Sequence, residues 1–137
     1  MADRWPVVHD QARAGRLVVR AALLAFALTA SVHAYAGDAD VIAVVVRQTA
    51  GLYDLDVTIR SKDTGWERYA DRIEALSPDG AVLGTRVLEH PHDDEQPFTR
   101  DLYELRVPPG ITSVTVRAHF KPTGFDGTTK TVPLPGR

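Results

Sequence analysis

Residues 52–60 alternate strictly between apolar and polar side chains from Tyr53 onward, and this pattern constrains the fold more than any other. The apolar side chains at every second position are Tyr53, Leu55, Val57 and Ile59. Successive side chains of a β-strand point to opposite faces, whereas one face of a helix recurs about every 3.6 residues. The segment is therefore predicted to be a strand with one face in the core and one in solvent.

Six further segments are rich in β-branched or alternating apolar residues and are bounded by turn residues. They are residues 41–47, about 70–76, 81–88, 98–107, 114–120 and 128–134. Residues 66–76 also suit a short helix, but the tight-turn signal Ser-Pro-Asp-Gly at residues 77–80 follows at once and leads into another apolar run. Strand, tight turn and strand together predict a hairpin.

Seven short strands in about 100 residues, with turns every 8–12 residues, are typical of one antiparallel β-sandwich. We therefore predict an all-β fold of the immunoglobulin or fibronectin III type, with a small closed barrel as the alternative. A chain of this length buries roughly 60–70% of its unfolded surface, which is enough for one core.

The first 36 residues have the composition of a secretory signal peptide. Four arginines lie within residues 1–20, an uncharged run occupies residues 21–30, and small residues follow at Ala34-Tyr35-Ala36. A basic region, a short apolar region and an A-x-A site are the three parts of such a peptide. The run is shorter than the roughly 20 residues that span a bilayer. We therefore expect residues 37–137 to be one domain, periplasmic or secreted, in a bacterium.

Residues 37–137 are acidic overall and contain no cysteine. The first 36 residues hold four of the 16 Lys and Arg and two of the 18 Asp and Glu, so 12 basic and 16 acidic residues remain. Nucleic acid and anionic membranes require a basic face, so neither is expected as a partner. We expect no membrane span after removal of the signal. The missing cysteine excludes disulfides, thiolate metal ligands, a thiol nucleophile and a lipidated cysteine within this sequence.

Residues 90–95 combine two imidazoles and three carboxylates. These groups are ligands of Zn²⁺, Cu²⁺ and Ni²⁺. In an extended chain His90 and His92 point to the same side, about 6–7 Å apart. We therefore predict a candidate metal site on this loop, formed by His90, His92 and Glu95. Asp94 and His119 are the alternatives for its third ligand.

The same stretch also fits a purely structural loop. Acidic residues between strands are commonly solvated, and Glu95 is placed to pair with Arg100 and fix the loop. His90 could end the preceding strand with its ring bonded to the backbone. The third possibility is that the loop binds something other than a metal, and for this role Arg100 is a candidate interaction residue.

Trp66 and Tyr69 are the second feature that could carry function. A tryptophan near the start of a middle strand usually packs in the core of a sandwich, and we expect core packing here. Aromatic side chains on a rim also bind sugars or peptides. Trp66 and Tyr69 are therefore candidate interaction residues as well.

Signatures of known enzyme classes are absent from the sequence. It contains no G-x-S-x-G, H-E-x-x-H, G-x-G-x-x-G or C-x-x-C. The adjacent carboxylates at residues 93–95 do not suggest the opposed pair of a glycosidase. Residues 121–127 lack the spacing of a phosphate loop. Triad members need not be close in sequence, so an enzyme of unrecognised type stays open although a non-enzyme is expected. No cofactor is expected apart from the possible transition metal.

Four strings between residues 65 and 100 carry a resemblance. They are Gly65-Trp-Glu-Arg-Tyr-Ala-Asp71, Pro78-Asp-Gly80, Leu83-Gly-Thr-Arg-Val-Leu-Glu-His-Pro-His92 and Glu95-Gln-Pro-Phe-Thr-Arg100. Over about residues 52–134 the chain resembles a family of small, uncharacterised secreted bacterial proteins with an H-P-H-x-x-E-Q-P-F-T-R motif. A tryptophan often stands there in place of Ile73. The resemblance implies an exported β-domain in which the motif residues act as one unit, and it implies no substrate or catalytic residue.

Three functions follow from these observations. The first is an exported, non-enzymatic β-sandwich that binds an unknown protein partner in the envelope, for example by pairing an edge strand with a strand of that partner. The second is a periplasmic metal-binding protein that uses His90 and His92. The third is an enzyme of unrecognised type.

Overall fold

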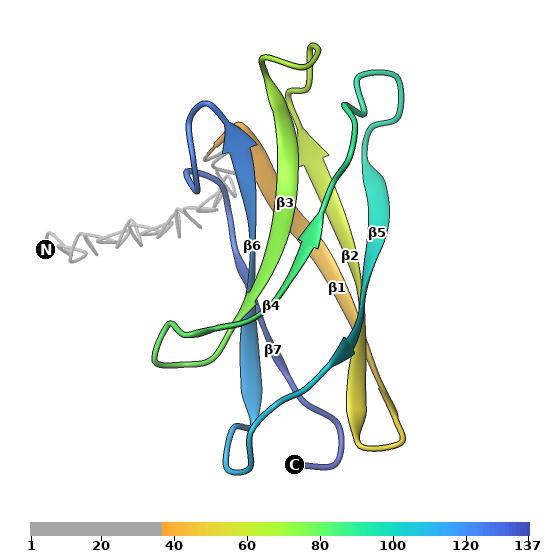
Figure 1. The fold of residues 1–137 in the computed structure, drawn as a ribbon, viewed down its shortest axis with the longest axis vertical. Helices are drawn as coiled ribbons and strands as arrows, with labels where there is room; N and C mark the ends of the chain where they lie inside the picture. The colour runs from red at the N-terminus through yellow and green to blue at the C-terminus, as the bar shows by residue number, and fades with distance from the viewer. Residues whose placement is uncertain (1–36) are drawn as a thin grey trace, which may run out of the picture. The chain divides into compact units, whose positions relative to one another are not determined.

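The computed structural model describes residues 37–137, which form two antiparallel sheets with seven strands (Figure 1). The strands are β1 (Ala39–Thr49), β2 (Leu52–Ser61), β3 (Tyr69–Leu76), β4 (Val82–Val87), β5 (Phe98–Leu105), β6 (Ser113–Lys121) and β7 (Lys130–Pro133). The prediction of an all-β sandwich is confirmed, and the described residues contain no helix that could cross a membrane. The predicted signal peptide, residues 1–36, lies outside the described residues.

The strand order is β1-β2-β5 in one sheet and β4-β3-β6-β7 in the other. All neighbouring strands are antiparallel. The strands β4 and β5 follow each other in sequence but belong to different sheets, and each forms an edge. They contact each other across one side of the sandwich, so two unpaired strand edges lie side by side there.

Alternating side chains of β2 and β6 fill the core between the sheets. The four apolar residues predicted to share one face of β2 are all fully buried. Val114, Val116, Ala118 and Phe120 of β6 are buried in the same alternation. Removing apolar surface from water, at about 25 cal/mol per Å², is the main stabilising contribution of such a core.

The predicted hairpin is confirmed as β3 and β4, so residues 69–76 form a strand rather than a helix. Its turn is closed by a hydrogen bond from the Gly80 amide to the Ser77 carbonyl, 2.9 Å long. Gly80 has a φ of 88°, a left-handed conformation that glycine adopts without steric cost.

Three connections lie at the same end of the sandwich, opposite the C-terminus (Figure 1). They join β2 to β3, β4 to β5, and β6 to β7. The first carries Trp66 and the second carries both histidines of the candidate metal site. In sandwiches of this type, loops clustered at one end commonly form a binding surface.

Candidate functional site

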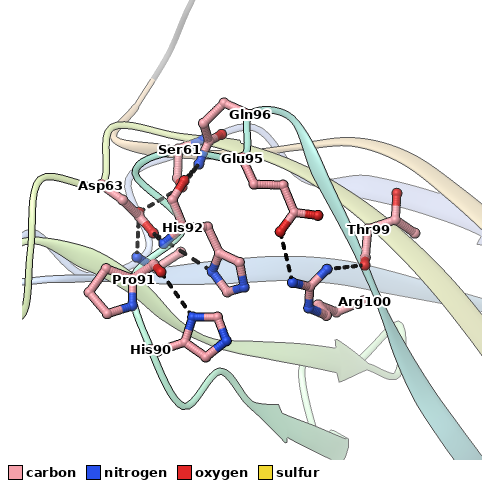
Figure 2. Close-up of polar contacts among 10 residues, drawn as sticks. Ser61, Asp63, His90, Pro91, His92, Glu95, Gln96, Thr99 and Arg100 are labelled. Carbon is pink, nitrogen blue, oxygen red and sulfur yellow. Dashed lines mark hydrogen bonds and ion pairs between the residues drawn. The ribbon is translucent and has the colours of Figure 1, made fainter.

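The loop with the two histidines is held to the end of β2 by the carboxylate of Asp63 (Figure 2). Its Oδ2 accepts the main-chain N–H of His92 at 2.8 Å. Its Oδ1 accepts the Ala70 N–H at 2.9 Å and the Ser61 hydroxyl at 2.7 Å. The Asp63 side chain is fully buried, and an unpaired buried carboxylate would be costly. Three donors from three segments satisfy it instead, so this carboxylate fixes their relative positions.

Gln96 forms a second link between the same segments. Its Oε1 accepts the Ser61 N–H at 2.8 Å, and its Nε2 donates to the Ser61 hydroxyl and to the His92 carbonyl, both at 3.0 Å. The main chain of His92 is therefore bonded through both its N–H and its C=O. Sequence reasoning missed Asp63 and Gln96 as site residues.

The side chain of His92 is buried, and the residue is 2% exposed. It stacks on Phe98 with ring centroids 3.9 Å apart and planes 8° apart. Neither ring nitrogen has a hydrogen-bond partner among the described residues. The nearest carboxylate oxygen, Asp63 Oδ2, is 3.9 Å from Nδ1, which is too far for a hydrogen bond. Burial, and then the nearby charge of Arg100, lower the pKa of His92 below its ordinary value, which favours the neutral ring.

His90 is exposed and lies against His92, with ring centroids 4.5 Å apart. Its Nδ1 is 2.9 Å from the carbonyl of Pro91. Because β4 ends at Val87, His90 belongs to the loop and does not end the strand. The two rings of the candidate metal site are thus neighbours, one in solvent and one in the core.

The three alternatives for a third metal ligand are engaged or solvated. Glu95 accepts a hydrogen bond from Arg100 at 3.0 Å, as predicted, and this bond lowers the pKa of Glu95. His119 pairs with Asp71 at 2.6 Å, and Asp94 is exposed. No group of three or more His, Cys, Asp or Glu residues within residues 37–137 is placed to hold a metal ion. The metal site therefore stays a prediction without an observed third ligand.

A small hollow of about 90 Å³ lies beside the two histidines. Its polar lining consists of His90, His92, Arg86, Glu89 and Arg100. Arg86 also lines a larger groove of about 390 Å³ between β4 and β5. The hollow and the groove are therefore neighbours along the open side of the sandwich.

The groove owes its shape to a bulge in β5. Leu55 pairs with Leu102 and Tyr53 pairs with Leu105, so residues 103–104 face a single residue of β2. Glu104 has a φ of 53°, and its N–H donates to Asp54 Oδ1 at 2.9 Å. Bulges re-aim side chains and commonly lie beside functional sites.

Small and large side chains complement each other across the groove. A Cβ at Gly84 of β4 would approach Leu105 Cδ1 to 2.6 Å, so glycine permits the close contact of β4 with β5. Tyr103 lines the groove and is 61% exposed. An exposed aromatic side chain on a free strand edge is a typical contact residue of a protein interface.

The expected core packing of Trp66 is wrong, because its side chain is 62% exposed. Trp66 lies in the connection before β3, which begins at Tyr69. The two rings meet edge to face with centroids 5.7 Å apart. The core positions of this strand are filled by Ala70 and Ile73 instead. The Trp66 side chain is therefore accessible to a binding partner, as a candidate interaction residue must be.

His119 and Asp71 lie in a charged network on the second sheet. Arg117 and Arg72 both donate to the carboxylate of Glu74. Burial raises the pKa of Glu74, but these hydrogen bonds outweigh it and the net shift is downward. The charged groups satisfy one another, which is typical of a structural network rather than of a catalytic site.

A protein of Halomicrobium mukohataei is similar to this chain and carries the name "Putative lipoprotein". The two are 37% identical over 93 residues, which is 66% of this chain and 44% of that protein. The chain therefore spans less than half the length of this relative. No family model and no solved structure matches the chain.

We expect Asp63→Asn to destabilise the protein by about 3 kcal/mol, because an amide in either orientation turns its NH₂ toward a buried donor. Denaturant unfolding would measure this loss, and hydrogen exchange of the His92 amide should accelerate. Asp56→Asn is the matched control, since Asp56 pairs with Arg47 at the surface. Equal stability of the two variants would show that the Asp63 bonds do not hold the loop.

We expect His92→Phe to match or exceed wild-type stability at pH 7, by up to about 1 kcal/mol, because it removes two unsatisfied polar atoms and retains stacking on Phe98. Because the pKa of His92 is lower in the folded protein than in the unfolded chain, the unfolded chain binds a proton at a higher pH than the folded protein does. The contribution of His92 to the free energy of unfolding is therefore fully present above pH 6.5 and is lost as the pH falls from there through the lowered pKa of the folded state. Thermal unfolding across this range should show that loss in wild type and not in the variant. If the melting temperatures of wild type and His92→Phe depended on pH in the same way, His92 would not be the buried neutral group described here.

Proposed function

We propose that the chain is an exported, non-enzymatic accessory module that binds a protein partner in the cell envelope. The signal-like composition of residues 1–36 and the similarity to a protein named as a lipoprotein both favour export. What that name says about lipid attachment is said of that protein and is not carried over to this chain. The partner is a protein segment in extended conformation, lying in the groove between β4 and β5.

The observation that carries this proposal is the pair of free strand edges beside a groove that is lined by both apolar and charged side chains, among them Tyr103 and Arg86. Among the described residues, exposed large apolar side chains are Val45, Trp66, Val82, Val87, Tyr103 and Phe125. Half of them lie on β4 and β5. Unpaired edges offer main-chain hydrogen bonds to an added strand, and neighbouring side chains give the addition its specificity.

The loops at the nearby end of the sandwich extend this surface. Trp66 is an exposed tryptophan, and tryptophan is strongly enriched among the residues that dominate binding energy in interfaces. Arg86 lies on β4 in both the groove and the hollow. A partner that follows the groove therefore reaches the loop of His90 and Arg100 without leaving the surface.

A photo-cross-linking side chain at Tyr103 tests this proposal in cells that make the protein. We expect Tyr103 to cross-link a defined partner peptide, and the matched position Val45, on the free edge of β1, to give none. Val87→Lys should abolish the cross-link, because it places a charge on the exposed end of β4, next to Arg86 of the groove. Equal yields from both positions, or no effect of Val87→Lys, would reject the groove as the binding surface.

Metal binding by His90 and His92 is the second candidate function. It is favoured by the unpartnered nitrogens of His92 and by the 4.5 Å separation of the two rings. The lowered pKa of His92 keeps the ring in the neutral form that ligates metals. Arg86 and Arg100 line the same hollow, however, and their charges oppose a cation.

Metal content of tag-free protein distinguishes the two functions. If the loop binds metal, Zn²⁺ or Cu²⁺ added to chelated protein should bind stoichiometrically and raise the melting temperature by mass action. His90→Ala/His92→Ala should lose this response. His119→Ala is the matched control, because His119 pairs with Asp71 on β3 and β6. No shift at excess metal would eliminate the metal function.

A further inference from the structure

The ring of His92 is a buried polar group whose hydrogen bonds are unmade within the described protein. Its main-chain groups are bonded to Asp63 and Gln96, so the backbone of His92 is fixed beside the hollow. Buried polar atoms without a partner are rare in folded proteins and call for an explanation such as a bound ligand. The stacking on Phe98 explains the orientation of the ring but satisfies neither nitrogen.

The hollow beside this ring is rich in hydrogen-bond donors. A guanidinium has five N–H donors. Within the described residues, Arg100 uses two of them, on the Thr99 carbonyl and on Glu95, and Arg86 uses one, on Asp101. Both arginines line the hollow, and Glu89 is the only acidic residue among the described residues that line it. The neutral imidazole of His92 adds one further donor.

We propose that this hollow is a binding site for a carboxylate group, held by the guanidinium groups of Arg86 and Arg100 and by a ring N–H of His92. Guanidinium forks match the two oxygens of a carboxylate and bind them with charge-assisted hydrogen bonds. The hollow, with a volume of about 90 Å³, has room for a group as small as a carboxylate.

The exposed ring of His90 provides the entry to the site. It covers His92 with ring centroids 4.5 Å apart, and exposed side chains change rotamer on the picosecond to nanosecond timescale. Rotation of His90 exposes a nitrogen of His92 to a ligand in the hollow. Figure 2 shows Arg100 on the other side of the His92 ring, where it is held by Glu95.

Free hydrogen-bond donors, rather than net charge, favour an anion in the hollow. Arg86 and Arg100 line it together with Glu89, and each arginine already pairs with one carboxylate, Asp101 and Glu95 respectively, but keeps further N–H donors. The positive charge of Arg100 lowers the pKa of His92, second only to burial, and the same charge disfavours any other cation beside the ring. The site needs no groove partner to bind a free carboxylate, although Arg86 of β4 lines both the hollow and the groove.

Titration of the full protein with sodium acetate, against sodium chloride at equal ionic strength, tests the site. We expect acetate to shift the ring NMR signals of His92, because a ring N–H would donate to the bound carboxylate. Arg86→Gln should weaken acetate binding about tenfold. Arg47→Gln, the same change in a surface ion pair on β1, should leave it unchanged.

A second arm identifies the source of the carboxylate. A blocked tripeptide with a central Glu is compared with the Gln tripeptide and with acetate. Tighter binding of the Glu peptide assigns the site to an acidic side chain of a partner, whereas equal binding of acetate assigns it to a free small carboxylate. The proposal is overturned if acetate acts no differently from chloride in the wild-type protein, or if Arg86→Gln and Arg47→Gln bind acetate equally.

Discussion

The arrangement of the candidate site depends on one buried carboxylate, Asp63. Its two oxygens hold the hydroxyl of Ser61, the amide of Ala70 at the start of β3, and the amide of His92. A charge is retained in such a place only where hydrogen bonds compensate the loss of solvent. These bonds in turn connect two loops that are separated by the whole β3–β4 hairpin.

The environment of His92 follows from this anchor. Because Asp63 and Gln96 fix the main chain of His92, its ring is directed onto Phe98 at the edge of the core. Arg100 is held close by Glu95, and its charge adds to burial in favouring the neutral imidazole. The loop is therefore structural in its backbone and chemically unsatisfied in its ring, which reconciles the two interpretations of the His-Pro-His sequence.

Local pattern predicted the strands, because β2 and β6 alternate with period two and the Pro-Asp-Gly turn is specific. The pairing of Glu95 with Arg100 was also predictable, since the two are close in sequence. The role of Asp63 was not, because its partner His92 is 29 residues away. The exposure of Trp66 depends on where β3 begins, and strand boundaries are weakly encoded in sequence.

The two free edges are shaped by bulges, which limit the strands that can be added to them. Leu83 is unpaired in β4, and Tyr103 and Glu104 interrupt β5, so only the parts of each strand beyond the bulge are regular. Bulges protect edges from unselective pairing. The regular parts, residues 84–87 and 98–102, carry Arg86 and Arg100. An added strand must therefore pass these two arginines, and its side chains meet the donors of the hollow before any other charged group of the loop.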